Sequence, residues 1–248
     1  MWSIIIFIRS RVSFSAKIYH KNKNIPFYKK WVTSELITWC CLTILMLCIG
    51  ILSLNKELLK ISFLENLSLL LAILSLLLLI IAGFKRFFEH EKLNGKLQGE
   101  ISLNENSIII NNETYLFNKI KDFKIGFGNK YGDLTGNTKI GPMYSQGLNN
   151  SVSFYNESKY IEVFFQLKTE NQLNSLKQYL YFYVISEVLP LNTRTLQYVD
   201  KKFKHTNEFK NLIHKYIKNG TFSCTEGLLI IGYSSDKEAS ELRKQYCS

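Results

Sequence analysis

The sequence lacks the common catalytic and cofactor motifs. It has no H-E-x-x-H zinc site, no G-x-S-x-G nucleophile turn, no C-x-x-C pair and no EF-hand loop. Its four histidines are scattered, and no two of them have the spacing of metal ligands. We therefore expect a protein that is not an enzyme and that holds no metal or cofactor.

Cysteine is also sparse, with five residues in 248. Three lie in an apolar segment near the N-terminus, whereas Cys224 and Cys247 lie near the C-terminus. Because their spacing matches no disulfide framework, we expect reduced cysteines in a reducing cytosol.

Acidic residues are absent from residues 1–30, which carry seven lysines and arginines. The whole chain has a net charge of +11, as many nucleic-acid-binding proteins have. Here, however, the positive charges precede an apolar segment, where such charges contact anionic lipid and fix orientation. We therefore do not expect a nucleic-acid partner.

Charged residues are missing from two long runs, residues 36–55 and 66–84. Residues 67–84 include nine leucines and three isoleucines and nothing more polar than serine. At about 1.5 Å per residue they span about 27 Å, close to the ~30 Å of a bilayer core. We predict a two-helix transmembrane hairpin over residues 35–84. The alternative is a pair of buried helices in a soluble core, but such helices normally show a polar stripe that is missing here.

Basic residues flank the open ends of this hairpin, whereas the hinge carries two lysines balanced by two glutamates. The positive-inside rule then places both termini in the cytoplasm and the hinge, residues 55–66, outside. The localisation expected is a multi-pass protein of a bacterial inner membrane. The predicted membrane-interface residues are Lys29, Lys30, Trp31, Trp39, Lys85 and Arg86.

Residues 1–34 are predicted to form a basic N-terminal arm. Its apolar run, residues 4–8, is too short for a signal peptide and has no preceding positive charge. We expect residues 1–20 to be a disordered arm or a segment lying in the membrane interface.

After the hairpin, over residues 85–190, the apolar pattern changes to the two-residue period of strands. Thr169 and Gln172 form a capping box before an amphipathic helix that Pro190 ends. We expect an α+β protein in which this helix closes an antiparallel sheet or barrel. The six strands, predicted in meander order, are residues 99–103, 107–111, 113–117, 120–127, 151–155 and 160–167.

This order of elements resembles that of bacterial pleckstrin-homology-like membrane proteins of the YcxB-like group. The resemblance covers about residues 29–190 and includes Gly99-Glu100-Ile101 at the start of the sheet and the strand–turn–strand unit of residues 115–125. It implies seven strands, one more than the pattern predicts, with the additional strand hidden in a loop or absent. It implies no catalytic residues.

The loop from Gly126 to Gly147 holds six of the thirteen glycines. It matches neither a dinucleotide fingerprint nor a phosphate loop. We consider two interpretations, a flexible connection and a ligand or partner loop at the mouth of the barrel. The contact residues of the second are Lys130, Tyr131, Lys139 and Tyr144.

Residues 191–248 are predicted to form a small helix–hairpin–helix appendage. Thr206 caps a helix over residues 207–218, and Ser235 with Glu238 caps a second helix that ends near Tyr246. Between them, residues 221–224 and 228–233 are expected to pair as a β-hairpin.

These observations favour a non-catalytic, membrane-anchored binding or scaffold domain for a protein, a peptide or a lipid headgroup, and they allow a homo-oligomer. One alternative is a ligand-gated membrane effector whose strand domain senses a small molecule such as a nucleotide signal. Another is a soluble nucleic-acid-binding protein, which requires the apolar runs to be core.

Overall fold

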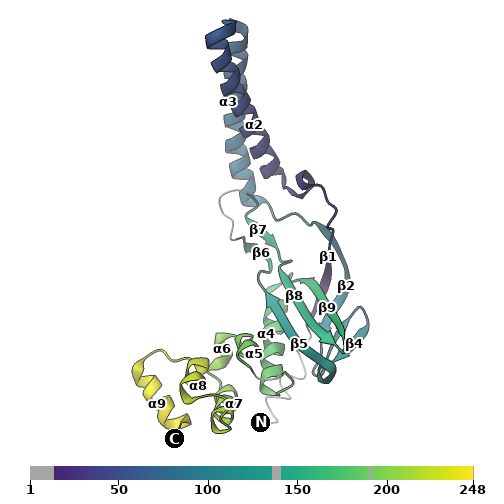
Figure 1. The fold of residues 1–248 in the computed structure, drawn as a ribbon, viewed down its shortest axis with the longest axis vertical. Helices are drawn as coiled ribbons and strands as arrows, with labels where there is room; N and C mark the ends of the chain where they lie inside the picture. Colours follow the sequence, from purple (N-terminus) through teal and green to yellow (C-terminus); the bar gives the residue numbers. More distant parts are fainter. Residues whose placement is uncertain (1–13, 136–140, 190–191, 248) are drawn as a thin grey trace.

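The protein, seen here in a computed structural model, consists of a long helical hairpin that projects from a domain of sheet and helices (Figure 1). The structure describes residues 14–135, 141–189 and 192–247. The strands are β1 (Phe14–Lys21), β2 (Gly95–Leu103), β3 (Ser107–Ile110), β4 (Glu113–Leu116), β5 (Ile120–Phe127), β6 (Tyr131–Leu134), β7 (Tyr144–Gln146), β8 (Asn150–Asn156) and β9 (Lys159–Gln166). The longer helices are α2 (Thr33–Leu54), α3 (Ser62–Lys85), α4 (Glu170–Ile185), α7 (Asn207–Lys218), α8 (Cys224–Ile231) and α9 (Asp236–Tyr246).

The predicted hairpin is present as α2 and α3, which pack side by side (Figure 1). A short π-helical turn, η2 (Asn55–Leu59), joins them. The Asn55 side chain closes this turn, because its amide donates to the Ile61 carbonyl and accepts from the Ile61 N–H. Glu65 lies in the first turn of α3, where its negative charge interacts favourably with the positive end of the helix dipole.

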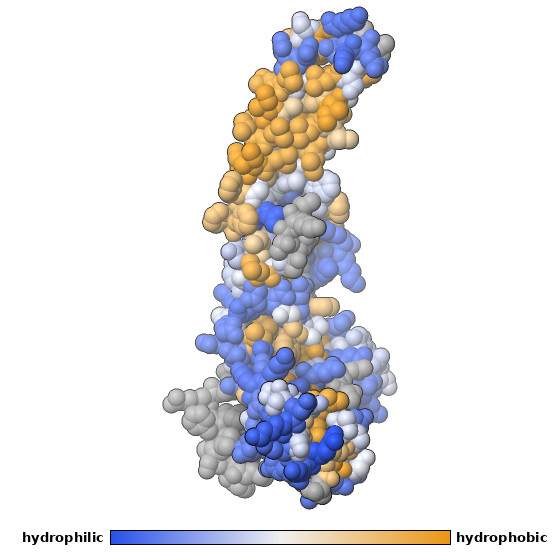
Figure 2. All heavy atoms as spheres, turned by 90° about the vertical axis from the view of Figure 1, so that its left-hand side faces the viewer, coloured by the Kyte–Doolittle hydropathy of each residue, from blue (hydrophilic) through white to orange (hydrophobic). Residues whose placement is uncertain are grey.

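The hairpin is not the core of a soluble domain. Only 11% of the apolar window of α2 and 17% of that of α3 are buried. Figure 2 shows a continuous hydrophobic surface along the hairpin, with hydrophilic residues at its tip. Both helices are long and apolar enough to cross a membrane.

Small and polar side chains separated by seven residues form the buried seam between the two helices. Because a seven-residue repeat keeps one face of each helix turned toward its partner, this spacing gives a continuous contact line. Small residues let helix backbones approach closely, which is how helices pack in lipid. The seam consists of Ser34, Cys41, Cys48 and Asn55 on the first helix and its turn, and of Ser68, Ser75 and Ala82 on the second.

The main antiparallel sheet has seven strands in the order β4-β3-β2-β1-β9-β8-β5. All six predicted strands are present, but they do not form one meander. Two meanders, β2-β3-β4 and β5-β8-β9, meet on β1, which pairs with β2 on one side and with β9 on the other. Because β4 and β5 are at opposite edges, the sheet is open and does not close into a barrel.

Strand β1 corrects the expectation for the N-terminal arm. Residues 14–20 are neither disordered nor interfacial, because Phe14, Ala16 and Ile18 are buried in the main core. Lys17, between two of them, is exposed. The hairpin is therefore inserted between two neighbouring strands of one sheet. Residues 1–13 of the predicted arm lie outside the described residues.

Helix α4 covers one face of the sheet, as the capping box predicts. The Thr169 hydroxyl accepts from the Gln172 N–H, and the Gln172 amide oxygen accepts from the Thr169 N–H. Leu176, Leu180 and Tyr183 of α4 are fully buried in the main core. The core between sheet and helix is therefore filled.

The C-terminal unit packs on the other side of α4, where Tyr181 and Val184 belong to a second hydrophobic core. In residues 192–247 the unit contains helices and no strand, and the expected β-hairpin is wrong. Residues 224–231 form α8, whose capping box joins Ser223 and Glu226 and whose Leu228 is buried. The short helices α5 (Thr193–Gln197) and α6 (Lys201–Lys204) lead into it.

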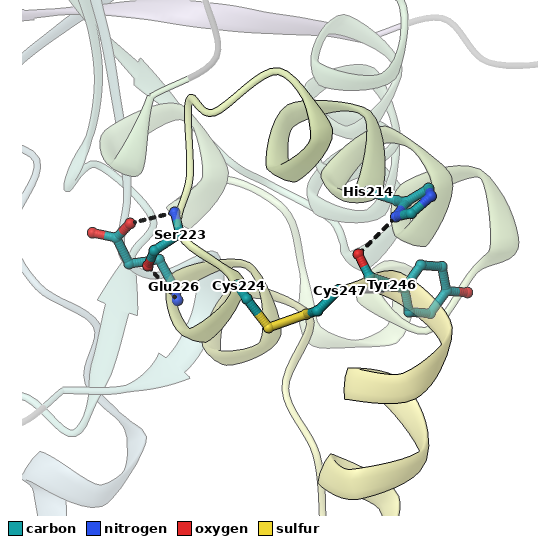
Figure 3. Close-up of a disulfide and its surroundings, with 6 residues drawn as sticks. All are labelled: His214, Ser223, Cys224, Glu226, Tyr246 and Cys247. Carbon is teal, nitrogen blue, oxygen red and sulfur yellow. Dashed lines mark hydrogen bonds between the residues drawn. A yellow bond between two sulfur atoms is a disulfide. The ribbon is translucent and has the colours of Figure 1, made fainter.

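A disulfide between Cys224 and Cys247 joins the start of α8 to the end of α9 (Figure 3). The structure therefore differs from the expectation of five reduced cysteines, because it joins this pair, and the form present in a cell depends on the redox state of the compartment. Their Cα atoms are 5.6 Å apart although 23 residues separate them in sequence. Beside the disulfide, His214 Nδ1 donates to the Tyr246 carbonyl over 2.9 Å. Helix packing, which the sequence spacing does not reveal, brings these groups together.

Candidate functional site at the neck

The hairpin joins the sheet through two segments, residues 27–35 and 85–94, which we call the neck. Carboxylates of both segments bind the N-terminus of α2. Glu89 accepts from the hydroxyl and the N–H of Ser34, at 2.5 and 3.2 Å, and Glu35 accepts from the Val32 N–H at 2.9 Å. Negative groups are favourable at this end of a helix. The two neck segments are therefore held together where the hairpin begins.

The glycine-rich loop binds the neck. Part of it forms a separate two-stranded sheet, β6 and β7. The Tyr144 N–H donates to the Glu89 carbonyl, and the Glu91 N–H donates to the Tyr144 carbonyl. The Glu91 carboxylate also accepts from the Ser145 hydroxyl at 3.0 Å. In the described residues this loop is therefore a bracket between hairpin and domain rather than a flexible connection.

Three of the four predicted loop contacts are used within the fold. Lys130 pairs with Asp133 and Glu170, and its bond to Asp133 raises the lysine pKa above the ordinary value. Tyr131 stacks on His90 with ring centroids 4.5 Å apart, and Tyr144 contacts the same imidazole at a tilt with centroids 5.3 Å apart. The fourth predicted contact, Lys139, lies outside the described residues.

Aromatic and basic side chains surround the neck where the apolar hairpin surface ends. Trp31 stacks on Trp39 of α2 at 6.1 Å and contacts Phe27 edge-on at 4.7 Å. Phe84 at the end of α3 and Phe88 on the other segment are 67% and 81% exposed. Five of the six predicted interface residues lie in the two neck segments, and the sixth, Trp39, contacts the first segment through Trp31. The five are Lys29, Lys30, Trp31, Lys85 and Arg86.

A cavity of about 460 Å³ opens between the neck and the hairpin-side end of the main sheet. Tyr19 and Lys21 of β1 and Phe164 of β9 line it from the sheet. Lys30 and Lys92 line it from the two neck segments. The volume is within the range of about 300–1000 Å³ that is usual for small-molecule sites. We refer to it as the neck pocket.

The charges that line the neck pocket are not equally available to a ligand. Glu35 and Glu91 face it, but both carboxylates accept hydrogen bonds from the neck and its bracket. Lys92 donates to the Trp31 carbonyl at 3.2 Å. Lys21 and Lys30 have no ion-pair or hydrogen-bond partner for their ammonium groups among the described residues, and both are exposed. The three lysines and two glutamates of the lining carry a net charge of +1, and the ammonium groups left for a ligand are those of Lys21 and Lys30.

Sequence reasoning found Lys30 as an interface residue but missed Lys21, Lys92 and Asn149 as lining residues. They come from three segments far apart in the chain, and none belongs to a motif. The signal that was available is the apolar–polar alternation of residues 14–18, which identifies β1 and so places Lys21 at the end of a strand.

Among the described residues, no group of three or more His, Cys, Asp or Glu side chains is arranged to hold a metal ion. Cys224 is bonded to Cys247, so neither presents a free thiol in the structure. Comparisons with protein-family models, with curated proteins and with solved structures find no match to this chain.

Proposed function

We propose that the chain is a non-catalytic membrane protein whose hairpin spans the bilayer and holds a pleckstrin-homology-like domain at its surface. There the domain binds a protein, a peptide or a lipid headgroup. The observation that carries this proposal is the exposed apolar surface of α2 and α3, which ends in the aromatic and basic neck. Such a surface is unfavourable in water, whereas tryptophan and lysine at its end are typical of a membrane interface.

The dimensions of the hairpin support a complete crossing. At about 1.5 Å per residue, the 22 residues of α2 and the 24 of α3 span about 33 and 36 Å. A bilayer core needs about 30 Å. The hydroxyls of Thr38, Thr43 and Ser53 donate to carbonyls one turn earlier, which satisfies them without water.

The charge distribution favours a cytoplasmic domain in a bacterial inner membrane. Seven lysines and arginines precede the hairpin, and Lys85 and Arg86 follow it directly. The Cys224–Cys247 disulfide favours the opposite side, because disulfides persist mainly in oxidising compartments. We give more weight to the charges, since they act during insertion, whereas a cysteine pair is oxidised or reduced afterwards.

The pleckstrin-homology-like assignment is supported by seven strands in the main sheet and by the closing helix α4. A gated effector is less well supported, since it calls for a closed barrel with an enclosed polar pocket. The observed sheet is open, and its core is filled with apolar side chains. A soluble nucleic-acid-binding protein would require the two apolar runs to be buried, which they are not.

Two measurements test the proposal. Carbonate-washed membranes should retain the full chain, and its release into the supernatant would contradict membrane anchoring. In intact cells, an impermeant maleimide should label Lys56→Cys at the hinge but should reach Lys124→Cys on β5 only after lysis. The reverse labelling pattern would retain the anchor and overturn the cytoplasmic placement.

Partner binding is tested separately by crosslinking from membranes. The full chain is compared with a chain that lacks residues 128–147. Loss of a crosslinked protein in the second would support a protein partner at the bracket formed by β6 and β7.

A further inference from the structure

We propose that the neck pocket binds the phosphate-bearing headgroup of an anionic phospholipid. This inference rests on the proposed membrane anchoring and names the ligand of one site within it. The first argument is chemical. Lys21 and Lys30 present ammonium groups that no described side chain neutralises, and a phosphate is a strong acceptor for such donors.

The second argument is the composition of the pocket wall, which offers neutral polar and apolar contacts for a headgroup as well as positive charge. Asn94, Asn149 and Thr135 add neutral polar groups to the lysines. Phe164 and Leu148 add apolar area, which suits the glycerol and the first methylenes of a lipid. Because Glu35 and Glu91 are hydrogen-bonded within the fold, they do not pair with the two free lysines.

The position of the pocket supplies the third argument. Lys30 and Val32 of its wall flank Trp31, which stacks on Trp39. Aromatic residues of this kind lie at the headgroup level of a bilayer. A pocket beside them opens where lipid phosphates are concentrated, and this favours a lipid over a soluble anion.

Native mass spectrometry of the full-length protein in mild detergent tests this assignment. Phosphatidylglycerol and phosphatidylcholine are added as alternative probes. The unmodified chain should retain phosphatidylglycerol and not phosphatidylcholine. Removing both free charges with Lys21→Gln/Lys30→Gln should reduce the phosphatidylglycerol occupancy about tenfold or more.

The matched control is Lys17→Gln/Lys23→Gln. It removes the same charge from β1 and from the connection between β1 and α2, at exposed lysines that do not line the pocket. This control should bind as the unmodified chain does. Equal loss in both double variants would reduce the effect to general surface charge and overturn the proposal.

Blocking the pocket gives a second readout without a change in charge. Asn149→Trp should reduce lipid occupancy by filling the cavity, whereas Asn22→Trp, at a position outside the lining, should not.

Equal retention of both lipids by the unmodified chain would overturn the assignment of an anionic headgroup. Displacement of the lipid by inorganic phosphate alone, at equal concentration, would assign the pocket to a free anion and overturn the lipid source.

Failure of this inference is distinct from failure of membrane anchoring. The pocket variants should remain in carbonate-washed membranes, because the hairpin is unchanged in them. A chain that stays in the membrane but shows no headgroup selectivity would overturn the headgroup assignment and leave the anchor intact.

Discussion

At the scale of single residues, the bracket depends on one backbone position. Gly147 has a φ of +68°, and an added Cβ there would lie 2.3 Å from the Leu167 carbonyl oxygen and 2.6 Å from the Tyr131 nitrogen. These two atoms hydrogen-bond to each other at 2.7 Å, and this bond ties β6 to the end of β9. Only glycine combines this conformation with this approach.

Gly147→Ala should therefore destabilise the domain by about 2 kcal/mol or more, through strain and the loss of close contacts. Thermal unfolding of the detergent-solubilised chain would measure this loss. Gly132→Ala is the comparison, since its φ is also positive but nothing lies within 4 Å of its added Cβ. Equal losses in both variants would show that conformation alone matters.

A second single-residue effect depends on pH. The Lys177 ammonium lies 2.7 Å from Asp200 and holds the pKa of that carboxyl below its ordinary value. Because the folded pKa is lowered, the pair contributes stability above the unfolded pKa of about 3.9, and this stability is lost as pH falls through the folded pKa.

Asp200→Asn should cost about 1 kcal/mol at pH 7 and progressively less as the pH falls through the lowered folded pKa of Asp200, since asparagine keeps the cap of α6 but loses the charge. Denaturant titrations at pH 7 and over a series of acidic pH values would measure the difference. In a Lys177→Gln background this pH dependence should disappear, because the partner charge is gone. A constant loss across the series would contradict the role of the charge.

At the scale of elements, β1 contributes more to the stability of the domain than its place in a basic arm suggests. Ile18 is 3% exposed and lies in the central strand of the sheet. Ile18→Asp should cost about 3–5 kcal/mol, because it buries an unpaired charge. Limited proteolysis of the domain would detect the loss. Lys17→Asp, on the exposed face of the same strand, should have little effect, and equal sensitivity would contradict the placement of β1.

The seam of the hairpin makes a separate prediction about helix packing. Ser75→Leu adds volume where two helices meet and should cost about 1–3 kcal/mol. The temperature at which the buried thiols of Cys41 and Cys48 begin to react with a thiol-reactive dye would measure this loss of stability. Ser53→Leu, an exposed position on α2, is the matched control. Unchanged melting of Ser75→Leu would contradict the seam.

At the scale of the whole molecule, the redox state of one cysteine pair tests on which side of a membrane the proposed anchor holds the domain. If the domain is cytoplasmic, all five cysteines should accept an alkylating mass tag in cells quenched with acid. After mild oxidation of isolated membranes, two fewer tags are expected, because Cys224 and Cys247 are then joined. Only three tags in quenched cells would place the domain in an oxidising compartment.

Local signals predicted much of this architecture, and non-local pairing accounts for what they missed. The absence of charge located the hairpin, and Thr169 with Gln172 located α4. The role of β1 could not be read from the sequence, because its partners lie beyond the hairpin and at the far end of the sheet. The neck pocket combines residues from Tyr19 to Phe164 for the same reason. The helical α8 was missed although Ser223 and Glu226 form a local capping box.

The insertion of the hairpin between β1 and β2 has a consequence for biosynthesis. The ribosome synthesises β1 before the hairpin, but both neighbours of β1 in the sheet are synthesised after the hairpin, and β9 is the last strand in the described residues. With the proposed membrane anchoring, this central strand would remain unpaired while the insertion machinery takes up α2 and α3. The domain would complete its sheet only after the hairpin has been placed, so that membrane delivery precedes folding on the surface.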